Sequence, residues 1–246
     1  MALRFNGMNL LAPPRRFDPS CPELIDRPDT DRGLLREELR VLERMNRRLG
    51  GHQLLLQYAK RFLRSAKGAS LSILDLGTGA ADIPRAIVAW VRSRKLAVSI
   101  TAVDGNPDVL RIAHESCRGW PEIRLEQHDL RALPYVADSY DLVLCSLALH
   151  HFDWADAVAI LRRMQEMARV GYIVNDLRRN WAAIWTAELV ARTVIRSTVI
   201  RHDGPQSCRA AFTIHELRTL AQQAGLSNFQ IKRHHGVFRM GLEGRK

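Results

Sequence analysis

Short apolar runs alternate with amphipathic segments along the middle of the chain. The first run covers Ser72 to Leu76, and an amphipathic segment follows from Ala80 to Arg94. Further apolar runs cover 98–103, 123–127, 141–147 and 172–174, with helical spacing over 109–117 and 154–168 between them. Runs of this length, bounded by glycine or polar residues, are typical of buried parallel strands. The pattern therefore predicts an α/β fold in which helices cover both faces of a parallel sheet.

Polar side chains stand where the predicted strands end, namely Asp75, Asp104, Asp129, His150 and Asp176. Ligands of doubly wound sheets bind at the carboxyl ends of the strands. Each of these residues alone could be a helix cap or a turn former, but five in register indicate one crevice. Asp104 is placed to accept hydrogen bonds from two ribose hydroxyls, and Asp129 to face an adenine amino group.

The turn after the first strand carries Gly77 and Gly79, which permit unusual backbone angles and close approach of a ligand. A dinucleotide-binding turn needs a third glycine three residues after the second, and here that residue is Asp82. A carboxylate there would repel a pyrophosphate but could bind an ammonium group. The expected ligand therefore has a ribose and a cationic end, without phosphate.

The first 69 residues read as an arm and two helices. Residues 1–31 are rich in proline and charge and predict an extended arm. Helical spacing follows over 34–49, ending at Gly50-Gly51, and again over 52–65. These helices could cover one side of the crevice or simply pack against the sheet, and their spacing does not decide between the two. Nor does it show whether Arg47 and Arg48 face a ligand.

Residues 177–212 form an insertion that an ordinary connection would not need. Asn180 can cap an apolar helix from Trp181 to Ile200, followed by the polar run 201–205. Charges at Glu188, Arg192 and Arg196 argue against a membrane span. We expect a lid or an interfacial helix meeting a lipid-like substrate, with a dimer or core helix as the alternative. Thr213 then opens a capping box for a helix over 214–224.

Charge and cysteine content limit the partners and the compartment. The formal net charge is +11, distributed as +6 over residues 1–70, −3 over 71–176 and +8 over 177–246. Basic flanks suit nucleic acid, anionic lipid or an anionic substrate, and an arginine-rich composition explains them equally well. The four scattered cysteines, without a C-x-x-C pair, predict neither a metal site nor disulfides and fit a reducing cytoplasm. The first residues lack the apolar region of a signal peptide.

Several stretches together resemble the class I S-adenosylmethionine-dependent methyltransferases. They are residues 74–79, 102–107, 128–130 with Leu133-Pro134, 138–143 and 149–152. The chain is most similar to the ubiquinone/menaquinone-biosynthesis type and to bacterial methyltransferases of polyketide and phenolic-lipid pathways. The resemblance implies a seven-stranded, doubly wound Rossmann-like sheet with its last strand antiparallel, the final pair lying over 226–233 and 237–242. It implies one domain, with the cofactor-binding core at 70–176, the lid at 177–212 and a C-terminal helix and strand pair at 213–246.

The resemblance also implies roles for residues around S-adenosylmethionine. Gly77 and Gly79 would contact its methionine part, Asp104 the ribose, and Gly105 or Asn106 the adenine. Asp129 would meet the adenine amino group, Leu130 would pack on the ring, and Ser146 or Leu147 would lie under the sulfonium. Asp75 and Asp82 complete the expected cofactor-binding set.

Methyl transfer asks little of the protein beyond alignment and removal of a proton from the acceptor. A histidine is the natural base for a phenol or enol, and the candidates are His150, His151 and His202. Asn175, Asp176, Arg178, Arg179 and Asp203 are the expected substrate contacts.

These observations favour a methyltransferase of natural product biosynthesis that acts on a small, apolar aromatic, phenolic or polyketide-like acceptor. Methylation at oxygen is favoured, with C-methylation of a quinone-type ring as the next choice. We expect no nucleic-acid partner, since no aromatic stacking platform is evident. An RNA methyltransferase and a non-catalytic binding protein with the same fold are the alternatives. A homodimer and contact with a membrane surface both remain open.

Overall fold

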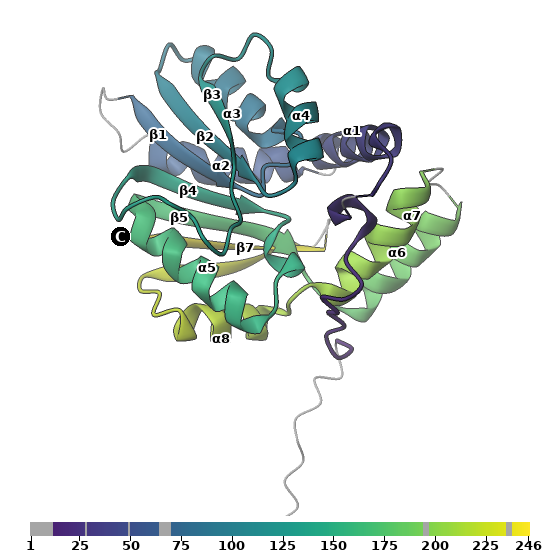
Figure 1. Cartoon of the computed structure of the whole chain (residues 1–246). Helices are drawn as coiled ribbons and strands as arrows, with labels where there is room; N and C mark the ends of the chain where they lie inside the picture. The colour runs from purple at the N-terminus through teal and green to yellow at the C-terminus, as the bar shows by residue number, and fades with distance from the viewer. Residues whose placement is uncertain (1–11, 28, 49, 64–69, 194–196, 235–237) are drawn as a thin grey trace, which may run out of the picture.

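Seven strands form one sheet in the order β3-β2-β1-β4-β5-β7-β6 (Figure 1). The computed structural model describes residues 12–27, 29–48, 50–63, 70–193, 197–234 and 238–246. The strands are β1 (Leu71–Leu76), β2 (Val98–Asp104), β3 (Ile123–Gln127), β4 (Tyr140–Ser146), β5 (Ala168–Leu177), β6 (Phe229–His234) and β7 (Arg239–Arg245). The helices are η1 (Leu24–Asp26), α1 (Arg32–Arg48), α2 (Gly51–Leu63), α3 (Asp82–Arg92), α4 (Pro107–Ser116), η2 (Leu149–His151), α5 (Trp154–Met167), α6 (Trp181–Thr193), α7 (Thr198–Ala210) and α8 (Ile214–Gln223).

The central strand β1 is buried on both faces because apolar side chains alternate across it. Ile73 packs on the side of α2 and α3, whereas Leu74 and Leu76 pack on the side of α5 and α8. β1 pairs in parallel with β2 and β4, which brings three strand ends to one edge. The central strands and helices predicted from the sequence are confirmed to within a few residues.

The last strand runs against the others, as expected. β7 pairs antiparallel with both β5 and β6, and Tyr172 of β5 lies directly opposite Gly244. The pair begins two to three residues later than predicted, and residues 235–237 lie outside the described residues.

The predicted single helix over 181–200 is wrong. Two helices, α6 and α7, pack side by side at the edge of the molecule, and residues 194–196 between them, Arg196 included, are not among those described (Figure 1). The polar run 201–205, expected after the helix, lies inside α7 with Pro205 in its interior. Tertiary contacts here override local helix propensity, because Asp203 accepts hydrogen bonds from the backbone N–H groups of Leu24 and Ile25.

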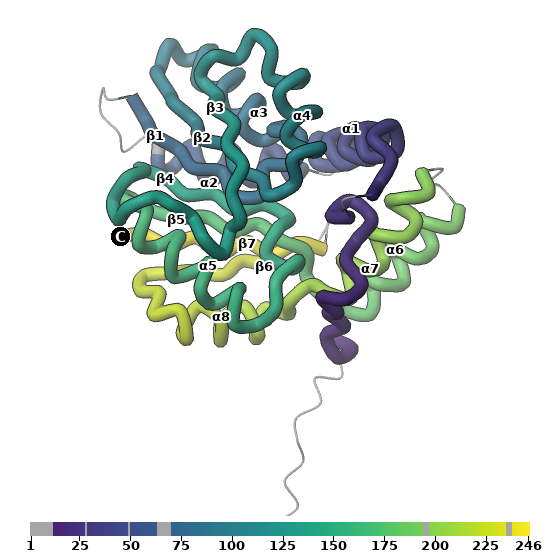
Figure 2. Tube along the Cα trace, viewed as in Figure 1, coloured from purple at the N-terminus to yellow at the C-terminus, as the bar shows by residue number. Residues whose placement is uncertain are grey.

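Those partners belong to an N-terminal strap, which we define as residues 12–27. Figure 2 shows this segment passing between α1 and the α6–α7 pair. Arg15 fixes it by donating to the carbonyl oxygens of Ala210 and Phe152, and its guanidinium lies 3.9 Å from the ring centroid of Phe212. The arm expected from the sequence is therefore docked where it is described, whereas residues 1–11 lie outside the described range.

Among the helices described, none is long and apolar enough to cross a membrane.

Gly244→Ala should lower the free energy of unfolding by about 1–3 kcal/mol, the usual effect of overpacking. A Cβ atom at this position would lie 2.1 Å from Cζ of the buried Tyr172. Urea denaturation measures the change. Gly105→Ala is the matched control, since its Cβ would have 3.7 Å to the nearest atom; equal stabilities of the two variants would contradict the packing described.

Candidate functional site

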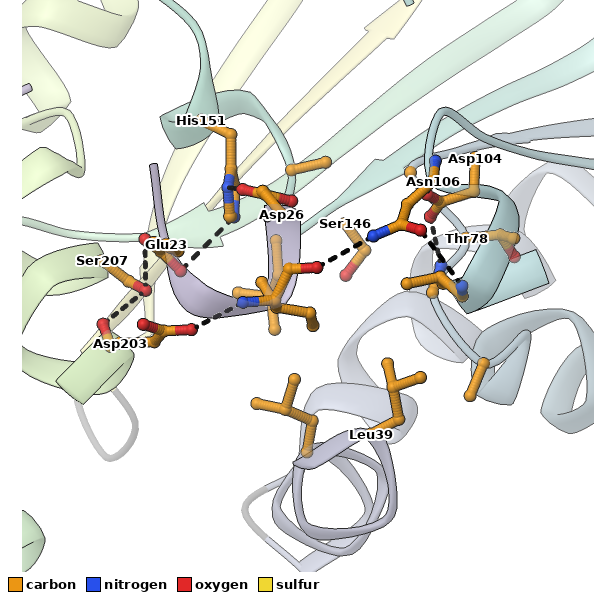
Figure 3. Close-up of a pocket in the computed structure, with 18 of the residues that line it drawn as sticks. Glu23, Asp26, Leu39, Thr78, Asp104, Asn106, Ser146, His151, Asp203 and Ser207 are labelled. Atoms are coloured by element: carbon orange, nitrogen blue, oxygen red, sulfur yellow. Dashed lines mark hydrogen bonds and ion pairs between the residues drawn. The ribbon is translucent and has the colours of Figure 1, made fainter. Parts of the chain in front are cut away.

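A cavity of about 900 Å³ opens at the carboxyl ends of β1, β2 and β4 (Figure 3). Its other walls come from α1, η1, α6 and α7. Asp75, Asp104, Asp129 and His150 line it, and Asp176 lies directly behind His150. Four of the five strand-end residues predicted to share a crevice thus line this cavity, and the fifth contacts one of them.

The turn after β1 requires its glycines. Gly77 and Gly79 have φ of 68° and 56°, in the left-handed region that side chains disfavour. A Cβ atom on Gly77 would also lie 2.5 Å from the Cβ atom of Ala148, which follows β4. The turn and the end of β4 are consequently held against each other at the cavity wall.

Asp104 is held by the backbone of that turn and of the segment after β2. One carboxylate oxygen accepts from the Gly79 N–H at 2.9 Å and the other from the Asn106 N–H at 3.0 Å. Burial raises the pKa of Asp104 to about 6, against the lowering effect of these two bonds. Its fixed carboxylate faces the cavity together with Gly105 and Asn106.

Asp75 and Asp82 lie on either side of the glycine turn. Burial raises the pKa of Asp75 to about 7, and the nearby Asp82 and Asp104 add to the effect. Asp82 accepts from His52 at 2.7 Å and Asn46 at 3.1 Å. Burial alone would raise the pKa of Asp82, but these two bonds hold it below its ordinary value. The sequence predicted that Asp82 binds an ammonium group. Its carboxylate is already hydrogen-bonded to side chains of α1 and α2, although Asp82 also lines the cavity.

The remaining cofactor-binding candidates, Asp129, Leu130, Ser146 and Leu147, also line the cavity. Asp129 is paired with Arg131, while Leu130 is buried. Leu147 has a φ of 54°, an unfavourable value for leucine that is characteristic of functional loops. Its N–H donates to the Asn175 carbonyl oxygen at 2.8 Å, which stabilises the bend.

Two adjacent histidines follow β4, and each is held by a carboxylate through Nδ1. His150 contacts Asp176 at 2.6 Å, and both residues are buried. His151 contacts Asp26 of the strap, also at 2.6 Å. Burial would lower the pKa of His151, but Glu23 and Asp26 outweigh it and raise this pKa to about 10. His151 is therefore a cation at neutral pH.

Glu23, Asp26 and Glu38 were missed by the sequence analysis. They surround the same cavity with Asp203, which was expected as a substrate contact. Glu38 is 1% exposed, and its Oε2 has no hydrogen-bond partner in the part of the chain described. Burial, with Asp203, Glu23 and Asp26 nearby, raises the pKa of Glu38 to about 9. In the sequence, the one indication that Glu38 is buried was its position beside Leu39 on the apolar face of α1.

The other predicted residues lie away from the cavity. His202, a candidate base, contacts Asp203 at 2.7 Å but lines a separate groove between α6 and α7. Asn175 is fully buried and donates to Ser146. Neither Arg178 nor Arg179 lines the cavity, and Arg179 bonds to Pro13, Ala211 and Glu216. Arg47 and Arg48 are exposed on α1 and do not line it either.

Comparison with known proteins identifies the class. Residues 73–171 match the family model of a methyltransferase domain. An uncharacterized methyltransferase, YcgJ of Bacillus subtilis, is 27% identical over 100 residues, which are 40% of this chain. The match covers only 35% of that relative's length.

Solved structures share the fold. A methyltransferase from Aquifex aeolicus superposes with a TM-score of 0.59 at 14% identity, over 94% of this chain and 99% of its own. Magnesium protoporphyrin IX methyltransferase from Synechocystis, with bound S-adenosylhomocysteine, superposes with a TM-score of 0.57 at 14% identity. The superposition covers 81% of this chain and 84% of that protein. A candidate O-methyltransferase from Nostoc punctiforme superposes with a TM-score of 0.60 at 20% identity, over 85% of this chain and 58% of that protein.

Residues 73–171 therefore match a methyltransferase domain family, and the chain has the corresponding fold. The resemblance to class I S-adenosylmethionine-dependent methyltransferases is confirmed, and S-adenosylmethionine is supported as the cofactor.

Glu38→Gln should flatten the pH dependence of stability. The pKa of Glu38 is about 9 in the folded chain, against an ordinary 4.5. Its stabilising contribution is complete below the ordinary pKa and is lost as pH rises through the folded value. Between about pH 5 and about pH 8 the wild type should lose at least about 1 kcal/mol more than the variant. Urea denaturation at both pH values measures this, and parallel curves would contradict the assignment.

Proposed function

We propose that this chain transfers a methyl group from S-adenosylmethionine to a small apolar acceptor with an ionisable hydroxyl, such as a phenol or an enolised polyketide. The observation that carries the proposal is the buried His150–Asp176 pair beside the glycine turn. The candidate O-methyltransferase among the similar structures agrees with this acceptor chemistry. Natural product biosynthesis is the setting we expect for the proposed reaction.

The cavity wall suits the cofactor. Gly77 and Gly79 place no side chain between the turn backbone and a ligand, and Asp104 presents a fixed carboxylate to hydroxyl donors. When bound, S-adenosylmethionine supplies an electrophilic methyl group, so the protein needs only to align the acceptor and remove its proton. The volume of about 900 Å³ is at the upper end for a small-molecule site, which supports room for an acceptor as well.

The acceptor side of the cavity is lined by α6 and α7. Ala187, Val190 and Ala191 of α6 and Ile200 of α7 give it an apolar wall. Such a wall favours an aromatic or aliphatic acceptor over a sugar or a nucleotide. The carboxylate of Asp203 would disfavour an anionic acceptor in the same space.

His150 is the proposed base. Asp176 holds its Nδ1, and Asp176 also accepts from the His150 backbone N–H at 3.0 Å, so the ring orientation is fixed. Nε2 is then the nitrogen left to accept the acceptor's proton. His151, with its raised pKa, would remain protonated and stabilise the oxyanion that results.

Asp104→Asn should weaken binding of S-adenosylhomocysteine by about 10–100-fold, because it removes charge-assisted hydrogen bonds to the ribose. Isothermal titration calorimetry measures the affinity. Asp138→Asn is the matched control, since Asp138 is exposed and pairs with Lys246 outside the cavity. Unchanged affinity in Asp104→Asn would contradict the proposed ribose contact.

His150→Gln should lower kcat by about 10²–10⁴-fold, the usual contribution of a general base. Turnover is measured by mass spectrometry on a panel of alkyl-substituted phenols that stabilise the protein thermally. Affinity for S-adenosylhomocysteine should stay within about threefold, given that His150 is assigned to the acceptor rather than the cofactor. His202→Gln is the comparison variant; if it abolishes turnover while His150→Gln does not, the base has been misassigned.

A further inference from the structure

The outer face of α6 carries an exposed apolar stripe. Trp181, Trp185 and Leu189 are 43%, 65% and 62% exposed, among the largest hydrophobic exposures in the described chain. Their spacing of four residues puts them on one side of the helix. The ring centroids of Trp181 and Trp185 lie 5.9 Å apart, so the stripe is continuous at the N-terminal end of α6.

The opposite side of the same helix faces the cavity through Ala187, Val190 and Ala191. α6 is therefore apolar on two sides, unlike an ordinary surface helix with one apolar face and one polar face. Only the thickness of this one helix separates the cavity from the exposed stripe.

A basic groove borders the stripe. It has a volume of about 440 Å³ and lies between α6 and α7, and its lining includes Glu188, Arg192, Arg201 and Arg209. Glu188 pairs with both Arg192 and Arg209. The side chain of Arg201 makes no hydrogen bond or ion pair with any described residue and is exposed. Three arginines against one carboxylate leave the groove positive.

We propose that the outer face of the α6–α7 pair docks on an anionic lipid surface, with the stripe inserted among acyl chains and the groove holding headgroup phosphates. Tryptophan and leucine beside arginines are the composition of helices that lie in the membrane interface. A second copy of the chain fits less well, because a two-fold contact through the stripe would bring two positive grooves together. α6 would then separate the lipid phase from the cavity by one helix.

Co-sedimentation of the full chain with vesicles tests the proposal without any substrate. Vesicles of phosphatidylcholine and phosphatidylglycerol in equal parts should bind the protein, and added salt should weaken binding. Trp185→Ser combined with Leu189→Ser should weaken it by about tenfold or more, because the apolar transfer free energy is lost. Arg201→Glu should weaken binding to these vesicles and bring it to the level seen with pure phosphatidylcholine.

Val136→Ser is the matched control, since Val136 is 72% exposed and lies outside α6 and α7. It should bind vesicles like the wild type, and thermal unfolding should show all variants folded. No binding by the wild type, or equal losses in Val136→Ser and the α6 variant, would overturn the proposal. A wild-type dimer that the α6 variant converts to monomer, measured by light scattering, would assign the stripe to a second copy instead.

Discussion

Gly77 and Ala148 approach each other so closely that a single methyl group added at position 77 would not fit. This contact joins the turn after β1 to the segment after β4, the two neighbouring strand ends from which most of the cavity floor is built. The Gly79 N–H then bonds to Asp104 at the end of β2, so three parallel strands terminate in one connected layer. Close packing of the Ala148 side chain on the Gly77 backbone leaves the side chains after it, His150 among them, in fixed positions.

Local patterns sufficed for the sheet and the cofactor side of the cavity. An apolar run such as 71–76 predicts a buried strand without any knowledge of its neighbours. The carboxyl ends of parallel strands then meet at one edge of the sheet. Asp75, Asp104 and His150 were therefore found from strand ends alone. Asp82 was found too, but its partners Asn46 and His52 lie 36 and 30 residues away, and no spacing rule connects them.

The insertion over residues 177–212 was predicted poorly for a related reason. Residues 181–200 read as one helix because apolar residues surround most of its circumference, and 201–205 read as a break because glycine and proline are poor helix formers. α7 forms through this region where Asp203 bonds to Leu24 and Ile25, and where Ser207 donates to Glu23. These contacts join residues about 180 apart in sequence, beyond the reach of a pattern read along the chain. The same contacts explain why Glu23 and Asp26 were missed.

The strap has a consequence for how the protein is made. Its residues leave the ribosome before the strands and helices that follow, yet Leu24 and Ile25 bond to a residue 179 and 178 positions later. Domains generally begin to fold as their N-terminal parts emerge, and contacts of high sequence separation form late because closing a long loop costs entropy. The nascent chain can thus assemble β1 to β4 long before the carboxylates of the strap reach His151. The cofactor side of the cavity would be built during synthesis, and the acceptor side only once α7 has been made.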